Sequence, residues 1–152
     1  MTTAIIRRAL PGDAAAVTAL TRAAYAKWVP VIGREPLPMA MDHAAMIRDH
    51  RVDLLFVGEV LAALVEVVER EADLLIENLA VAPGFQGRGF GKRMLAHAEG
   101  IAVQGGRSTV RLYTNARFTA NVGLYLALDY QIEREEVMSL GTIIHMARQG
   151  LA

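Results

Sequence analysis

The sequence predicts an α/β fold with a mixed, mostly antiparallel central sheet of about seven strands, flanked on both faces by about four helices. Apolar residues recur at strand or helix spacing in short separate segments. Glycines and prolines lie between these segments, where turns are expected. The 152 residues are 53% apolar and carry no linker or internal repeat, so we expect a single domain over residues 1–152.

The N-terminal part is expected to contain one strand and two helices. After a Pro11-Gly12 turn, Asp13 is placed to cap the first helix. The stretch WVPVIGREPLP holds three prolines and a glycine, which are incompatible with a regular helix or a central strand. The predicted elements are a strand over 3–8, a helix over 13–26, a loop over 28–38, and a helix over 39–50 with Met39, Met46 and Ile47 facing inward.

The rest of the chain predicts a meander followed by alternating helices and strands. Gly58 and Glu59 mark a hairpin turn, Pro83 and Gly84 end a strand, and the Gly105-Gly106 pair stops a helix. In chain order the predicted elements are strands over 53–57, 60–68 and 73–81, a helix over 89–104, a strand over 108–114, a helix over 119–128, and strands over 130–134 and 142–148, the last one antiparallel.

Composition argues against several classes of function. Sixteen basic and sixteen acidic residues leave no net charge, so we expect no nucleic-acid partner and no membrane partner held by bulk positive field. Without cysteine there is no disulfide, thiolate nucleophile or cysteine-ligated zinc. The first residues lack a signal-peptide pattern, and no apolar run approaches the roughly 20 residues of a membrane span. A cytoplasmic protein is therefore expected, and a homodimer stays open.

Three alternate glycines stand where the 73–81 strand gives way to the 89–104 helix. Gly87, Gly89 and Gly91 lack Cβ atoms, so backbone N–H groups can converge on an anion beside the helix N-terminus. The dinucleotide fingerprint Gly-x-Gly-x-x-Gly does not fit this spacing, and neither does the P-loop, which needs an earlier glycine and a Ser or Thr after Gly-Lys. The loop is therefore expected to be a diphosphate cradle of another kind.

The string VAPGFQGRGFGKRML, from Val81 to Leu95, contains Val-x-Pro followed by Gln-x-x-Gly-x-Gly. It resembles the pyrophosphate-binding motif of the GNAT superfamily of acetyl-CoA-dependent N-acetyltransferases. The resemblance implies a GNAT-like fold and acetyl-CoA as co-substrate. The residues expected to bind the coenzyme are Leu79, Ala80, Val81, Gln86, Gly87, Arg88, Gly89, Phe90, Gly91, Lys92, Asn121 and Tyr125.

A second segment, TNARFTANVGLYLALDY, resembles the downstream region of the same superfamily. The resemblance assigns Asn121 to the pantetheine arm and Tyr125 to the thiol sulfur. Helical spacing puts these two residues one turn apart on one face. Coenzyme A leaves as a thiolate, and a phenol within hydrogen-bond reach can return its proton, so we expect Tyr125 to be the general acid. Asp129 departs from the usual glycine, although aspartate tolerates a left-handed turn.

Glu77 is the expected general base, acting directly or through water. An attacking ammonium must lose a proton, and a partly buried carboxylate can have a pKa raised toward neutrality. Asn78 follows on the opposite pleat, so one of the two faces away from the cleft unless a bulge intervenes. The superfamily pattern implies that this strand splays from the 108–114 strand, so that backbone groups of Leu79 and Val81 bind pantetheine and an N–H near Leu79 polarises the thioester.

The acceptor side is less constrained by sequence. The proline-rich loop is expected to lie beside the acceptor cleft, or else to close the core or contact another subunit. The candidate acceptor-binding residues are Trp28, Arg34, Met39, Asn78 and Asn115. We expect no metal, because His43 and His50 are separated by about 10 Å along their predicted helix, at roughly 1.5 Å per residue.

Together these features predict an N-acetyltransferase that transfers acetyl from acetyl-CoA to a primary amine by direct attack in a ternary complex, with a small molecule as the expected acceptor. With no cysteine to carry an acyl group, an acyl-enzyme of that kind is not expected. Two alternatives remain: a noncatalytic acyl-CoA-binding or regulatory module, and a transferase for protein or peptide amines.

Overall fold

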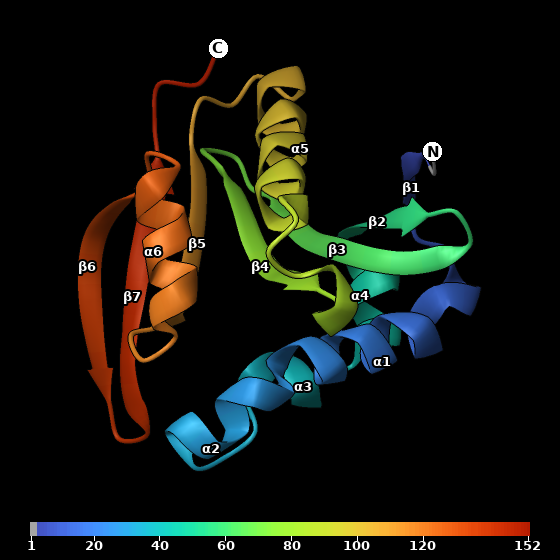
Figure 1. Cartoon of the computed structure of the whole chain (residues 1–152). Coiled ribbons are helices and arrows are strands. Elements are labelled where there is room, and N and C mark those ends of the chain that lie inside the picture. The colour runs from blue at the N-terminus through green and yellow to red at the C-terminus, as the bar shows by residue number, and fades with distance from the viewer. Residues whose placement is uncertain (1–2) are drawn as a thin grey trace.

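The computed structural model describes residues 3–152 and contains a seven-stranded sheet with helices on both faces (Figure 1). This confirms the predicted fold class. The strands are β1 (Ala4–Arg8), β2 (Arg51–Val57), β3 (Val60–Glu69), β4 (Leu74–Val81), β5 (Val110–Asn115), β6 (Gln131–Met138) and β7 (Gly141–Arg148). The helices are α1 (Ala14–Tyr25), α2 (Val29–Ile32), α3 (Leu37–Ala40), α4 (His43–Asp49), α5 (Phe90–Gln104) and α6 (Thr119–Ala127).

The strand order is β1-β2-β3-β4-β5-β7-β6. Every neighbouring pair is antiparallel except β4 and β5, which are parallel. The parallel pair is where helix α5 crosses over between two strands that sit side by side, as a βαβ connection requires. The sheet is therefore mixed and mostly antiparallel, as predicted, and its only parallel junction within residues 3–152 lies near the middle.

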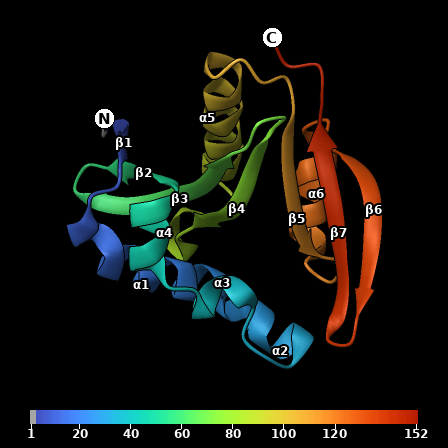
Figure 2. The same cartoon turned by 180° about the vertical axis from the view of Figure 1, so that it is seen from behind.

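Two apolar cores lie on opposite faces of the sheet. Helix α1 packs with residues such as Leu54 and Leu64 on one face, whereas α5 packs with Leu55, Val65 and others on the second face. Seen from the two sides, α4 covers the first face and α6 lies with α5 on the second (Figures 1 and 2). Adjacent residues in a strand point to opposite faces, so one strand such as β2 or β3 supplies both cores.

The segment from 28 to 50 differs from prediction. The expected loop over 28–38 contains helix α2 and the start of α3, because Pro30 and Pro38 stand in the first turns of these helices, where proline loses no intrahelical bond. The single helix expected over 39–50 is wrong as well. Helix α3 ends at Ala40, and Asp42 then caps α4 by accepting a hydrogen bond from the Ala45 N–H at 3.1 Å.

Asp13 does not cap helix α1 with its side chain, contrary to expectation. Its carboxylate instead accepts hydrogen bonds from the Leu10 N–H at 2.7 Å and from the Arg7 guanidinium at 2.9 Å. The Arg7 hydrogen bond is the main reason that the pKa of Asp13 is lowered. The carboxylate therefore stabilises the turn before the helix and not the helix terminus itself.

Strand β4 contains a bulge that changes which residues face each side. Glu66 pairs with Asn78, but the next residue of β3, Val67, pairs with Ile76, so Glu77 is the extra residue. Ile76 and Leu79 consequently both pack in the α5 core despite being three positions apart. A bulge adds one residue and resets the alternation. The side chains of Glu77 and Asn78 can therefore both lie on the α1 face of the sheet.

Candidate active site

The parallel pairing of β4 and β5 extends over only three residue pairs, from Leu74–Val110 to Ile76–Leu112. Beyond Ile76 the two strands diverge, and the opening is visible in Figure 1. The separation that the sequence led us to expect is therefore present. It leaves the second half of β4 with one edge that is not paired to β5, and backbone groups on that edge are free for other partners.

Two carbonyl groups of β4 point into this gap. The Leu79 oxygen accepts a hydrogen bond from the Tyr25 hydroxyl at 3.3 Å, and the Val81 oxygen accepts one from the Gln86 side-chain amide at 3.0 Å. Alternate residues of a strand direct their backbone groups to the same edge. Leu79 and Val81 thus present polar backbone toward the gap, whereas Ala80 between them has a buried side chain in the α1 core.

The glycine loop joins the end of β4 to helix α5. Gly87 and Gly89 have φ values of 74° and 84°, a left-handed conformation that favours glycine, and a Cβ added at either would meet no atom within 4 Å. The Arg93 N–H donates to the Gly89 oxygen at 3.0 Å. The N–H groups of the first three helical residues, 90 to 92, therefore lie at the open end of the helix, where its dipole favours an anion.

Side chains around the loop define its shape. The Arg88 guanidinium lies over the rings of Phe85 and Phe90, at 5.1 and 5.7 Å from their centroids. Gly91 approaches helix α6, and a Cβ there would lie 3.5 Å from Leu124. Lys92 is exposed next to the loop. The cradle therefore combines open backbone with two cations, one of them held by aromatic contacts.

A cavity that we call the channel lies between Gln86, at the start of the glycine loop, and Leu79 and Val81 of β4. Asn121 and Leu124 of α6 line one side, and Lys27 and Trp28, beyond the end of α1, line another. Lys27 donates a hydrogen bond to the Gln86 side-chain oxygen at 3.0 Å. Trp28 stacks on Phe118 with ring centroids 4.8 Å apart. Trp28 was expected near the acceptor, but it lines this channel.

Tyr125 lies deeper than Asn121, although the two are one helical turn apart. Its side chain is part of the α5 core, and its ring centroid is 6.1 Å from that of Tyr130. Burial raises the pKa of the Tyr125 hydroxyl to about 12. Within residues 3–152 this hydroxyl has no hydrogen-bond partner. The phenol therefore stays protonated near neutral pH, and Tyr125 lines neither the channel nor the pocket described next.

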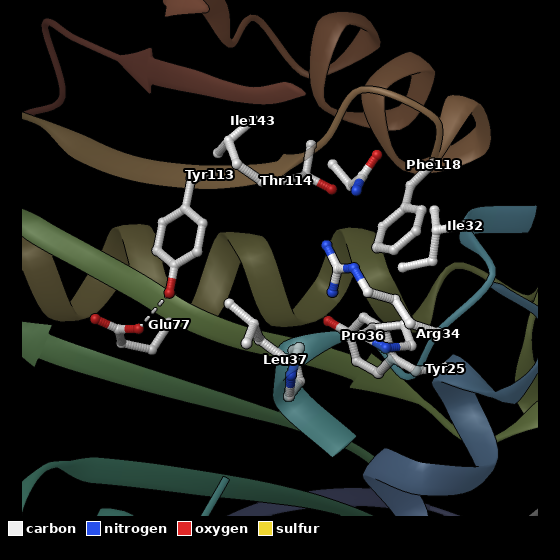
Figure 3. Close-up of a pocket in the computed structure, with 12 residues that line it drawn as sticks. Tyr25, Ile32, Arg34, Pro36, Leu37, Glu77, Tyr113, Thr114, Phe118 and Ile143 are labelled. Carbon is white, nitrogen blue, oxygen red and sulfur yellow. Dashed lines mark hydrogen bonds between the residues drawn. The ribbon is translucent and has the colours of Figure 1, made fainter. Parts of the chain in front are cut away.

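A second pocket lies on the α1 face of the same gap (Figure 3). Glu77 lines it and accepts a 2.7 Å hydrogen bond from the Tyr113 hydroxyl of β5. Burial and this hydrogen bond raise the pKa of Tyr113. Apolar side chains form much of the remaining wall, namely Ile32, Pro36, Leu37, Phe118 and Ile143. We call this cavity the acceptor pocket.

The other candidate acceptor residues fall in different places. Arg34 and Asn115 line the acceptor pocket, and the Asn115 side-chain oxygen also accepts from the Arg117 N–H at 2.9 Å. Asn78 is buried, donating to Thr21 at 3.3 Å and accepting from Tyr25 at 3.1 Å. Met39 is turned into the interior and lines neither the channel nor the acceptor pocket. The structure thus brings two of the five to the pocket.

Tyr25 is a site residue that the sequence did not reveal. It lines both the channel and the acceptor pocket, and its hydroxyl bonds both Leu79 and Asn78. Burial is the main cause of its raised pKa, and Tyr125 is the next contributor, so the two phenols lie near each other. No local pattern in the sequence marks Tyr25, because both of its hydrogen-bond partners are distant in the chain.

Asp129, which stands where the superfamily usually has glycine, has a φ of 71°. The left-handed turn expected from the resemblance is therefore formed with aspartate. No cluster of three or more potential metal ligands occurs in the part of the chain that the structure describes. Among those same residues, no helix is long and apolar enough to cross a membrane.

Residues 19–130 match the sequence model of the acetyltransferase (GNAT) family, which is well over half of the chain. The chain belongs to the GNAT family of acetyltransferases. It is therefore an acyltransferase by family. A comparison with curated protein sequences finds no match.

Solved structures share the GNAT fold at low sequence identity. PaiA N-acetyltransferase from Thermoplasma acidophilum, in complex with coenzyme A, superposes with a TM-score of 0.83 at 16% identity, covering 97% of this chain and 99% of that one. Spermidine/spermine N-acetyltransferase SpeG from Vibrio cholerae gives 0.73 at 17%, with coverages of 97% and 95%. Ribosomal-protein-S18-alanine N-acetyltransferase from Escherichia coli gives 0.71 at 19%, with coverages of 99% and 96%. The names of the last two proteins indicate very different acceptors, so this likeness shows the fold alone.

Proposed function

We propose that this GNAT enzyme, acting as one catalytic domain, transfers the acetyl group of acetyl-CoA to the primary amine of a small molecule by direct attack in a ternary complex. The observation that supports the proposal is that the channel and the acceptor pocket share Tyr25 and both adjoin the gap between β4 and β5. A donor entering along the channel and an acceptor entering from the α1 face meet there, as direct transfer requires.

Coenzyme binding is assigned to backbone groups more than to side chains. The N–H groups of residues 90 to 92 and the positive-φ glycines would hold the pyrophosphate, with Arg88 and Lys92 beside it. Leu79 and Val81 would bond the amides of the pantetheine arm, and Asn121 would contact it from α6. The Leu79 N–H would polarise the thioester carbonyl.

The transfer step needs two proton movements. Glu77, directly or through water, accepts one proton from the acceptor ammonium, and the free amine nitrogen then bonds the thioester carbon. As the tetrahedral intermediate collapses, its C–S bond breaks and Tyr125 gives its phenolic proton to the departing thiolate. The second nitrogen proton passes to the phenolate through solvent, which restores Tyr125. The products are an acetylated amine, coenzyme A as thiol, and one proton.

The test is to incubate the purified protein with acetyl-CoA and a panel of small amines and amidated peptides, measuring free thiol and product mass. We expect thiol release that depends on a small amine, with intersecting double-reciprocal plots that indicate a ternary complex. Parallel plots would contradict direct transfer. Acetylation of peptides alone would reassign the acceptor to proteins. Coenzyme binding without thiol release on any amine would overturn the transferase proposal.

A further inference from the structure

Arg34 stands out because it is a cation in a largely apolar pocket without a carboxylate partner among residues 3–152. Its two hydrogen bonds, from Nη2 to the Leu140 carbonyl and from Nη1 to the Glu35 carbonyl, are both 3.4 Å long. Protein N–H···O bonds are usually about 2.9–3.0 Å, so these are weak. The Arg34 Nε atom is buried and has no partner.

A buried donor without a partner is unfavourable, so its persistence at a pocket wall indicates a ligand that completes it. Figure 3 shows the guanidinium group extending from the α2–α3 segment toward β5, with Leu37 between it and Glu77. A guanidinium fork matches a carboxylate in geometry and charge. Arg34 can therefore receive an anionic group at a position separate from the base.

The acceptor pocket continues into a larger cavity on the outer side of Arg34. Arg34, Leu37, Tyr113 and Ile143 line both, and the outer cavity adds apolar side chains such as Met138 and Leu140. Its volume is about 380 Å³, against about 70 Å³ for the acceptor pocket. A small amine thus fits near Glu77, while an apolar group has room beyond Arg34.

The remaining charges of the outer cavity already have partners. Glu136 accepts a 2.9 Å hydrogen bond from His145, which is the main reason that its pKa is lowered, and Arg134 lies 3.8 Å from it. Among the residues that the structure describes, Glu77 is the only acidic one that lines the acceptor pocket. A polyamine would place several positive charges beside Arg34 with one carboxylate to receive them, which is unfavourable.

We infer that the acceptor is an α-amino acid with an apolar side chain, whose carboxylate binds Arg34 while its amine faces Glu77. This inference rests on the proposed transferase function and specifies its substrate class. The apolar side chain of the amino acid packs against Leu37 and Ile143 and extends toward Leu140. The negative carboxylate of the ligand thus meets the positive Arg34, and its positive amine meets the negative Glu77.

The experiment compares leucine with leucinamide, which keeps the amine and side chain but lacks the negative charge. The value of kcat/KM for each is measured in the wild type, in Arg34→Gln and in the control Arg8→Gln, an exposed arginine of β1. Taking the leucine-to-leucinamide ratio within each protein cancels the difference in amine basicity. We expect Arg34→Gln to lower this ratio about 10- to 100-fold, and Arg8→Gln to leave it unchanged.

A purely structural Arg34 would behave differently, because its loss would lower turnover of both acceptors equally and leave the ratio intact. That result, or a wild-type preference for spermidine or for amidated peptides, would overturn the inference. Thiol release from no amine at all would instead contradict the transferase proposal. In that case calorimetric binding of leucine and leucinamide to the wild type and to Arg34→Gln still tests the anion site.

Discussion

Glu77 and Tyr125 lie on opposite faces of the sheet, with the gap between β4 and β5 separating them. Glu77 lines the acceptor pocket on the α1 face, and Tyr125 belongs to the α5 core. The amine would approach the thioester from the α1 face of the sheet, and the thiolate would leave toward the α5 face. The two proposed proton transfers therefore need not compete for the same space.

Replacement of Tyr125 by phenylalanine tests the general acid. Because burial raises the pKa of this phenol to about 12, the group stays protonated at all lower pH values. We expect kcat to fall roughly 100-fold or more, the usual scale for a lost general acid, and by the same factor at every pH between about 6 and 9. Steady-state kinetics across this range are the measurement, with acetyl-CoA affinity and Tm as controls. An unchanged kcat would show that another group protonates the thiolate.

Replacement of Glu77 by glutamine tests the base. The amide cannot accept the ammonium proton, so the variant depends on the fraction of amine that is already deprotonated. We expect kcat/KM to fall most at low pH and to recover as pH rises toward the pKa of the amine. The matched control is Tyr113→Phe, which removes the hydrogen bond to Glu77 but keeps the carboxylate. A loss that is equal at all pH values would argue for a positioning role.

At the scale of elements, the loop between β4 and α5 has a geometry that only glycine adopts easily. Gly89 combines a φ of 84° with open space around its missing Cβ. A larger residue at this position introduces backbone strain, and a glutamate also introduces charge repulsion with phosphate. Alanine introduces the strain alone, so the two effects can be separated.

We expect Gly89→Glu to lower acetyl-CoA affinity at least about 10-fold more than Gly89→Ala, since one like charge in a phosphate cradle costs more than about 1.4 kcal/mol. Calorimetric titration of acetyl-CoA gives the affinity, and urea denaturation shows that each variant is folded. Equal affinities for the two variants would mean that the diphosphate does not bind at this loop.

Most elements could be predicted from sequence because their signals are local. The hairpin around Gly58 and the breaks at Pro83 and Gly105 follow from the residues at those positions, whereas the left-handed turn at Asp129 was expected from the resemblance. The sequence raised a bulge at Glu77 only as one of two possibilities, since a period-2 pattern is equally consistent with a regular strand. That Glu77 and Asn78 lie on the same face of the sheet became evident only from the pairing of β4 with β3.

Side-chain placement in the candidate site depended on tertiary contacts for the same reason. Met39 was a candidate acceptor contact because the superfamily pattern places its loop beside the acceptor cleft, but its side chain is buried, as its helical spacing with Met46 also predicted. Tyr25 was missed because its role comes from Asn78 and Leu79, which are more than fifty positions away in the chain. Among the candidate site residues, only those of the glycine loop could be placed from their position in a sequence motif.

At the scale of the whole molecule, a buried pair ties the α3–α4 segment to the sheet. His43 Nδ1 lies 3.1 Å from Glu66 Oε1, and both side chains are fully buried. His43 Nε2 lies 3.0 Å from the Pro38 carbonyl oxygen, to which it donates a hydrogen bond. Pro38 lines the acceptor pocket, and this pair therefore connects the pocket wall to β3.

Removing one member of this pair leaves the other buried without its partner. We expect His43→Leu to lower the free energy of unfolding by about 3–5 kcal/mol, and the double variant His43→Leu/Glu66→Leu to lose less than the single one. Urea denaturation of both variants and the wild type gives the comparison. A double variant less stable than the single one would show that Glu66 has adequate partners of its own.

The gap between β4 and β5 has a further consequence for handling the protein. Beyond Ile76 and Leu112 the facing edges of β4 and β5 are not paired with each other, and such edges invite pairing with other extended chains. An arm that carries amide groups, as pantetheine does, can occupy that place like an added strand. Coenzyme would then act as a protective partner, slowing amide exchange in the second half of β4 and suppressing self-association.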